Sequence, residues 1–213
     1  KKTLFSGGYQ YHMNDDILEE YINQHIKAST ENSISFLWHG GEPLLAGIDF
    51  YRMVTRLQRK HQPYGSEIIN GIQTNGTLLD DEWCSFMAKE KFLVGISIDG
   101  PGEMHNSYRR TRDDSSTLEQ VLRGFELLKK YGILPEILCV VNAHNVRYPL
   151  IIYNFYKQLG AKSMSFLPLV EPRSGSPNEV SSNSVPADEF GYFLSAIFDE
   201  WVEFRKIKKE KFS

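Results

Sequence analysis

The sequence predicts an α/β fold built around a parallel β-sheet. Five short apolar runs have the length of strands, and an amphipathic stretch with helical spacing lies between each run and the next. Apolar strands separated by helices are typical of parallel sheets with right-handed crossovers. The five predicted strands are 34–38, 68–73, 93–98, 137–141 and 163–167.

A helix is expected before the first strand. Asn14 is a typical N-cap residue, and the acidic residues that follow it are favoured by the helix dipole. The apolar stripe of this helix contains Ile17, Leu18, Tyr21, Ile22 and Ile26. Two further helices are expected over 50–61 and from residue 80, where acidic residues again occupy the first turn. A chain of this class rarely opens with a helix, so we expect a preceding strand to be missing.

Three more helices follow in the second half. Residues 116–119 have the spacing of a capping box, and Gly132 is placed to end that helix. Pro149 suits the first turn of the next helix and Gly160 its end. The last helix is expected from about Pro186. Its predicted buried face contains Phe190, Phe193, Leu194, Ile197, Phe198 and Trp201.

The predicted organisation is one core domain over residues 1–213. Residues 171–185 are rich in Ser, Pro, Asn and Gly and are expected to be irregular, either a lid over a substrate or a plain surface loop. Residues 186–210 are expected to form the last core helix and a basic linker toward a further domain.

Composition excludes several classes of function. The net charge is −3 at pH 7, so no basic field favours nucleic acid. No apolar run approaches the roughly 20 residues of a membrane span, and the first residues lack the apolar core of a secretory leader. We therefore expect a cytoplasmic protein that binds neither nucleic acid nor membrane.

Only two cysteines occur, Cys84 and Cys139, and both are expected to be buried thiols in a reducing compartment. Two cysteines are too few for a metal cluster. The sequence also lacks HExxH, GxSxG and GxxxxGK patterns and has no lysine within a predicted strand. No metal site is predicted in the chain, and zinc, serine-hydrolase, phosphate-loop and Schiff-base chemistry are not indicated.

Polar residues and glycines gather where the predicted strands end. Ligands of parallel α/β folds bind at this edge of the sheet. Each pair alone, such as Asn75-Gly76 or Asp99-Gly100, is a common turn dipeptide and fits a plain turn. His39 is the only histidine at a strand end. The concentration of such residues after successive strands is what predicts a ligand site.

These segments resemble those of radical S-adenosylmethionine enzymes. Residues 39–43 read HGGEP, 73–79 read QTNGTLL and 94–101 read VGISIDGP, followed by His105-Asn106 and Tyr108-Arg109. The set and its order are similar to the anaerobic sulfatase-maturating enzymes and their relatives in the SPASM group. The resemblance covers nearly the whole chain. It implies a partial (β/α)6 parallel barrel without its first strand and cluster loop.

The resemblance implies S-adenosylmethionine and a 4Fe-4S cluster as cofactors. The family's CxxxCxxC loop, which holds the cluster, and its cysteine-rich C-terminal domain do not occur in this sequence. We therefore expect a core domain truncated at both ends, with the cluster ligands outside the chain and no turnover by this piece alone.

Each implied role belongs to a residue that matches the family's motifs. Gly40, Gly41 and Glu42 would hold the amino group of the cofactor, and Ser97 would face its ribose and carboxylate. Arg109 would bind the carboxylate as a fork, although the neighbouring arginines 110 and 112 leave a surface ion pair as the alternative. The backbone near Val170 would contact adenine. The residues expected to form the site wall are His39, Gln73, Asn75 and Asn142.

The implied reaction is radical oxidation of a peptide. A 5′-deoxyadenosyl radical would take a hydrogen atom from the Cβ of a Cys or Ser in an unfolded sulfatase, and loss of a second electron and a proton would leave Cα-formylglycine. A flavodoxin or ferredoxin would supply the electron that generates the radical. No catalytic residue is assigned within the chain. Two alternatives remain: another SPASM-type peptide-modifying enzyme that forms crosslinks, and a non-catalytic α/β scaffold that has lost its cluster.

Overall fold

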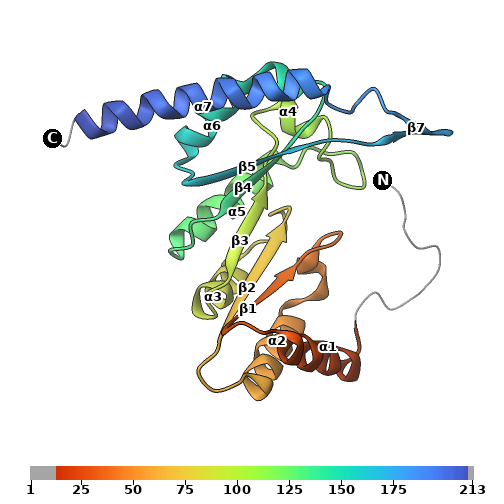
Figure 1. Ribbon diagram of the computed structural model, residues 1–213, viewed down its shortest axis with the longest axis vertical. Coiled ribbons are helices and arrows are strands. Elements are labelled where there is room, and N and C mark those ends of the chain that lie inside the picture. The colour runs from red at the N-terminus through yellow and green to blue at the C-terminus, as the bar shows by residue number, and fades with distance from the viewer. Residues whose placement is uncertain (1–12, 211–213) are drawn as a thin grey trace.

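The computed structural model describes residues 13–210, with the side chains of 177, 178 and 205–210 left out. Five parallel strands form one sheet in the order β1-β2-β3-β4-β5, which curves into a half-barrel (Figure 1). The strands are β1 (Ser33–Trp38), β2 (Glu67–Thr74), β3 (Leu93–Ser97), β4 (Glu136–Val141) and β5 (Ser163–Pro168). The predicted α/β class and all five predicted strands are confirmed.

A helix follows each strand, and one helix precedes the first. In Figure 1, α1 packs beside α2 at one end of the sheet and α6 beside α7 at the other. The α-helices are α1 (Asp15–Ala28), α2 (Ile48–His61), α3 (Asp81–Lys89), α4 (Glu103–Asn106), α5 (Leu118–Lys130), α6 (Pro149–Leu159) and α7 (Ala187–Glu210). Two 3-10 turns, η1 (Pro43–Ala46) and η2 (Asn145–Arg147), lie at the ends of β1 and β4.

The two faces of the sheet have different surroundings. Ile34, Phe36 and Trp38 of β1 are buried, whereas Leu37 between them is 69% exposed. The strand register places Leu37 beside Gly71 and Gly71 beside Leu93, so these residues share one face, and Leu93 is also exposed. The convex face is therefore covered by helices, and the concave face is open over the described residues.

Several helix ends follow the prediction. The Asn14 side chain accepts a hydrogen bond from the backbone N–H of Ile17, and Pro149 lies in the first turn of α6. Gly160 ends α6 in the left-handed conformation, with φ of 77°. The predicted capping box at 116–119 is wrong, because the side chain that precedes α5 makes no capping bond. Instead, Asn106 Oδ1 accepts the backbone N–H groups of residues 117 and 118.

Residues 171–185 are not wholly irregular, contrary to the prediction. A short antiparallel ribbon lies within them, formed by β6 (Pro172–Arg173) and β7 (Ser176–Val180). Gly175, with φ of 80°, lies in the connection between the two strands and permits the tight turn. Composition alone indicated a loop because turn residues outnumber apolar residues in this segment.

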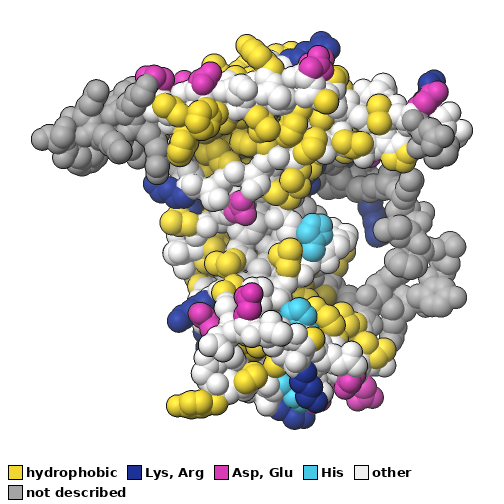
Figure 2. Space-filling model, viewed as in Figure 1, with side chains coloured by type: hydrophobic (Ala, Val, Ile, Leu, Met, Phe, Trp, Pro, Cys, Tyr) yellow, Lys and Arg dark blue, Asp and Glu magenta, His cyan; other side chains and the backbone are white. Residues whose placement is uncertain are grey.

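The buried stripe of α7 is narrower than predicted. Phe193 and Ile197 are buried, and the ring of Phe193 packs edge-on against Phe166 of β5. The prediction was wrong for Leu194, Phe198 and Trp201, which are between 40% and 60% exposed. Figure 2 shows hydrophobic side chains gathered along α7. Of the helices that the structure describes, none combines the length and apolarity needed to cross a bilayer.

Candidate functional site

The carboxyl ends of all five strands lie along one edge of the half-barrel, because the strands are parallel and paired in chain order. Glu42, at the end of β1, joins this edge to the end of β2. Its carboxylate accepts the Thr74 hydroxyl at 2.7 Å and the Asn75 backbone N–H at 2.8 Å. The same carboxylate also accepts a hydrogen bond from the backbone N–H of Leu44 at 3.1 Å and so caps the start of η1. The Glu42 side chain is thus occupied by protein partners.

The backbone of Gly40 and Gly41 faces open space. Apart from its chain neighbours, a Cβ atom added to either residue would have no atom of the described residues within 4 Å. Gly40 has φ of 131°, a conformation that favours glycine. His39 is exposed, and its Nδ1 accepts the Gly40 N–H at 2.6 Å. A ligand could therefore approach this backbone without displacing a side chain.

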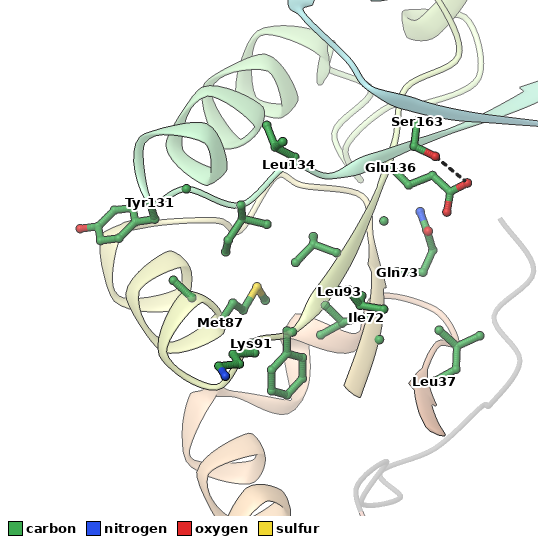
Figure 3. Close-up of a pocket in the computed structure, with 17 residues that line it drawn as sticks. Leu37, Ile72, Gln73, Met87, Lys91, Leu93, Tyr131, Leu134, Glu136 and Ser163 are labelled. Carbon is green, nitrogen blue, oxygen red and sulfur yellow. Dashed lines mark hydrogen bonds between the residues drawn. The ribbon is translucent and has the colours of Figure 1, made fainter. Parts of the chain in front are cut away.

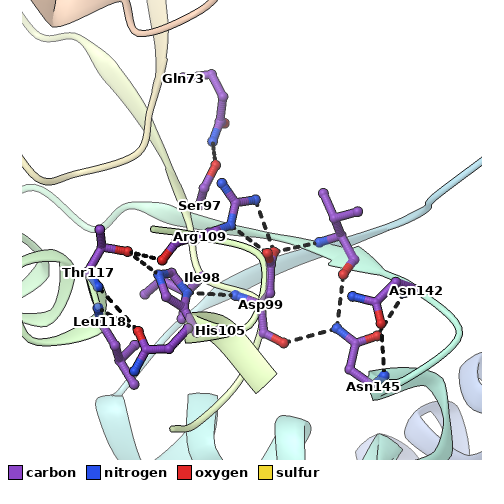
Figure 4. A network of polar contacts seen from close by, with 12 residues as sticks. Gln73, Ser97, Ile98, Asp99, His105, Arg109, Thr117, Leu118, Asn142 and Asn145 are labelled. Carbon is purple, nitrogen blue, oxygen red and sulfur yellow. Dashed lines mark hydrogen bonds and ion pairs between the residues drawn. The ribbon is translucent and has the colours of Figure 1, made fainter. Parts of the chain in front are cut away.

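Gln73 and Ser97 link the ends of β2 and β3. Gln73 Nε2 donates to Ser97 Oγ at 3.2 Å across the concave face (Figure 4). The Gln73 side chain crosses the space above Gly95, where an added Cβ would lie only 1.9 Å from Oε1. The absence of a side chain at Gly95 is therefore what allows the amide to reach the Ser97 hydroxyl.

Arg109 forms a two-point ion pair with Asp99, just after β3. Arg109 Nε donates to Asp99 Oδ2 at 2.5 Å, and Nη2 donates to Oδ1 at 3.0 Å. The Asp99 side chain is only 3% exposed and that of Arg109 is 24% exposed. Asp99 Oδ1 also accepts the backbone N–H of Val140 at 2.9 Å. This geometry differs from the surface ion pair that was the alternative for Arg109, because the partner carboxylate is buried.

His105 of α4 links the loop after β3 to the residue that precedes α5 (Figure 4). Its Nδ1 accepts the Asp99 backbone N–H at 3.2 Å, so the neutral ring carries its proton on Nε2, which lies 3.2 Å from Thr117 Oγ1. The Thr117 hydroxyl in turn donates to the carbonyl of Arg109 at 2.7 Å. Burial lowers the pKa of His105 to about 4.

The loop after β4 is held by two asparagines. Asn142 is buried, and its Oδ1 accepts the N–H groups of His144 and Asn145 within its own turn. Asn145 Nδ2 donates to the carbonyls of Asp99 and Val140, which ties the ends of β3 and β4 together. The Asn142 amide oxygen is thus used inside the loop and not at an open surface.

Two other predicted residues lie on the same edge. The Asn75 side chain accepts both the N–H and the hydroxyl of Thr77, so it shapes the turn after β2. Val170 follows β5 and its side chain is exposed. The preceding Leu169 N–H donates to Val141 O at 2.7 Å, which places Val170 beside the end of β4.

The contacts therefore form a continuous series from β1 to β5. Sequence reasoning missed Asp99 and His105 as site residues, although both belong to quoted motifs. The Asp99-Gly100 pair fits a simple turn, and the resemblance gives a role to Arg109 but none to His105. Asn145 gave no signal, because the partner that links it to β3, the Asp99 carbonyl, is 46 residues away.

Both cysteines are buried free thiols, as predicted. Burial raises the pKa of Cys84 to about 11 and that of Cys139 to about 12, so both remain protonated at neutral pH. Among the residues that the structure describes, no group of three His, Cys, Asp or Glu side chains could hold a metal ion.

A cavity of about 600 Å³ opens where β3, β4 and β5 begin, and it extends to residues 71–73 of β2 and Leu37 of β1. Its wall is mainly apolar and includes Leu37, Met87, Leu93 and Leu134 (Figure 3). Gln73 also lines this cavity, and its amide reaches Ser97 at the strand-end edge. The cavity therefore borders the polar site without containing it.

Comparison with known proteins identifies relatives over most of the chain. The serine-type anaerobic sulfatase-maturating enzyme of Bacteroides thetaiotaomicron is 38% identical over 95% of this chain and 52% of its own length. The cysteine-type enzyme of Clostridium perfringens is 37% identical over 90% of this chain and 51% of its own length. The chain thus spans about half the length of the curated relatives it matches.

Solved structures agree with this similarity. Native anSMEcpe with bound AdoMet and the Cp18Cys peptide superposes with a TM-score of 0.84, at 36% identity, over 90% of this chain and 53% of that one. Coproporphyrinogen III oxidase (HemN) from Escherichia coli shares the fold alone, with a TM-score of 0.62 and 10% identity. The model of the radical SAM superfamily matches residues 5–147. On this match and the parallel half-barrel, the chain belongs to the radical SAM superfamily.

Proposed function

We propose that this protein binds S-adenosylmethionine along the strand-end edge and is part of an enzyme that converts a Cys or Ser of a sulfatase to Cα-formylglycine. The observation that carries the proposal is the open Gly40-Gly41 backbone on the same edge as the Arg109 guanidinium, with hydrogen bonds that link the end of each strand from β1 to β4 to the end of the next. Relatives of both the serine and the cysteine type support the proposed reaction.

The residues present fit the charged groups of this cofactor. The backbone carbonyls of Gly40 and Gly41 would accept hydrogen bonds from the ammonium group. Because glycine has no side chain, the ammonium group has room to approach them. The Arg109 guanidinium would bind the carboxylate. The Ser97 hydroxyl and the backbone near Val170 remain the proposed contacts for ribose and adenine. Glu42 would act by fixing the loop, because its carboxylate is already bound to Thr74 and Asn75.

The residues present do not fit a 4Fe-4S cluster. The sequence has two cysteines, and both are buried in separate elements, α3 and β4. We propose that the cluster ligands come from outside the 213 residues, and that a flavodoxin or ferredoxin supplies the electron. Bound S-adenosylmethionine supplies hydrogen-abstracting radical chemistry when reduced. The chain itself contributes binding, orientation and exclusion of water.

The concave face offers a place for a peptide. Leu37, Leu93 and Leu167 are exposed there and share one face by register. The apolar cavity leads from the strand beginnings to Gln73, next to Ser97. An extended peptide segment could thus bring a side chain to the strand-end edge. Another peptide-modifying radical enzyme would use the same cofactor residues and is the second candidate.

The proposal is tested on the full-length protein with its cluster loaded under anaerobic conditions. A sulfatase peptide with Cys or Ser at the modified position should show the mass change expected for conversion of that residue to formylglycine. S-adenosylmethionine should be consumed in the same reaction. The same peptide with Ala at that position is the control and should stay unchanged. A crosslinked product in place of formylglycine would favour the second candidate.

A further inference from the structure

Asp99 is a buried carboxylate at the centre of the strand-end edge. Three N–H groups surround it, two from the Arg109 side chain and one from the Val140 backbone. The Val140 contact replaces a rung of the β3–β4 ladder, since the preceding rung runs from Ile98 N–H to Leu138 O. A buried charge is costly unless it is paired and hydrogen-bonded. Asp99 meets both conditions through these partners.

The pair leaves one part of the Arg109 guanidinium available. Nε and Nη2 are engaged by Asp99, while Nη1 has no hydrogen-bond partner among the side chains and backbone that the structure describes. The guanidinium is planar, so fixing two of its nitrogens also fixes the direction of the third. The side chain is 24% exposed although its partner is buried, so the free part of the fork can reach a ligand.

The backbone of Arg109 is fixed as well. Its carbonyl accepts the Thr117 hydroxyl, and its N–H donates to the carbonyl of His105 at 3.0 Å. Both ends of the side chain are therefore held, one by α4 and the residue before α5, the other by the end of β3. A side chain held in this way loses little conformational freedom when a ligand binds.

We propose that Asp99 is a positioning residue that orients Arg109 so that Nη1 faces the carboxylate of S-adenosylmethionine. Asp99 does not touch the ligand and acts only through Arg109. This proposal rests on the proposed function, because it requires that the strand-end edge binds that cofactor.

The test compares two ligands that differ only in the carboxylate, S-adenosylmethionine and its decarboxylated analogue. Dissociation constants are measured by calorimetry on the full-length protein with its cluster loaded. The wild type should prefer S-adenosylmethionine by roughly ten- to a hundred-fold, the range for a hydrogen bond to a charged group. Asp99→Asn should lose most of this preference. The amide keeps an oxygen for Val140 but directs an NH₂ group at Arg109 Nε.

Three variants make the result specific. Arg109→Lys keeps the positive charge beside Asp99 but removes the forked guanidinium. This variant should lose the preference for S-adenosylmethionine, and its melting temperature should stay near that of the wild type. Asp99→Asn combined with Arg109→Lys should lose no more than either single change. Arg112→Ala removes an exposed neighbouring arginine and should keep the full preference.

The outcomes separate this proposal from the proposed function. If Asp99→Asn weakens both ligands equally, Asp99 is only structural and the proposal is wrong. If Asp99→Asn keeps the full preference for S-adenosylmethionine while Arg109→Lys loses it, the role proposed for Asp99 is also wrong. Binding of the cofactor carboxylate by Arg109 would still stand. Wild-type protein that binds neither ligand would overturn the proposed function, and this proposal with it.

Discussion

The Glu42 carboxylate accepts the backbone N–H of Asn75 at 2.8 Å, although 33 residues separate them. This contact, with the Thr74 hydroxyl at 2.7 Å, joins the turn after β1 to the turn after β2. Glu42→Gln keeps the size of the side chain but leaves one acceptor oxygen. We expect a loss of about 1–3 kcal/mol in the free energy of unfolding, measured with urea. Glu82→Gln, at an exposed ion pair, should cost less than about 1 kcal/mol. Equal losses would contradict the role given to Glu42.

Packing between α5 and the turn after β2 depends on Gly124. A Cβ at this position would lie 2.5 Å from the backbone carbonyl oxygen of Gly76. That oxygen can move only if the backbone of the turn moves with it. We expect Gly124→Ala to destabilise the protein by roughly 1–3 kcal/mol through overpacking. Gly191→Ala in α7 is the matched control, because its Cβ meets no described atom within 4 Å other than those of its own helix turn. It should raise stability by up to about 1 kcal/mol. A neutral Gly124→Ala change would show that α5 does not pack this closely.

The start of α5 provides a test of its cap. Asn106→Ala removes the acceptor of two backbone N–H groups and should cost about 0.5–2 kcal/mol. Ser116→Ala should have no measurable effect, because no side-chain hydrogen bond caps the helix from that side. Thermal unfolding followed by circular dichroism distinguishes the two. The reverse ranking would restore the capping box that the sequence suggests.

His105 makes stability depend on pH. Its pKa is about 4 in the folded protein and about 6.5 in an unfolded chain, so between these values only the unfolded state binds the proton. Stability should therefore be fully present above pH 6.5 and fall as the pH drops toward 4, by up to about 3 kcal/mol. His105→Gln should flatten this part of the profile, whatever its effect at pH 7. An unchanged slope would assign the effect to other groups.

The sequence was sufficient for the elements whose signals are local. The five strands are short apolar runs, and Asn14, Pro149 and Gly160 act through groups within four residues of themselves. These interactions depend on spacing along the chain, so the pattern predicts them directly. The strand-end edge was predictable for a related reason, since parallel strands bring successive ends together.

Interactions between distant segments could not be predicted in the same way. Asp99 contacts Val140 across the sheet, and Asn106 caps a helix that begins 12 residues later, so neither partner is visible in the local sequence. In α7 the apolar pattern shows which positions could be buried. Only the packing against Phe166 shows that Phe193 is covered and Phe198 is not.

The most direct test of the central claim is the affinity of Gly41→Ala for S-adenosylmethionine, measured by calorimetry on the cluster-loaded protein beside the wild type. Beyond the neighbouring residues of the chain, the added methyl group meets no atom within 4 Å in the part of the chain that the structure describes, so the melting temperature should stay the same. If the cofactor approaches this backbone, its dissociation constant should rise about ten-fold or more, as expected when a close polar contact is lost. Unchanged affinity in a normally folded variant would contradict binding at the strand-end edge.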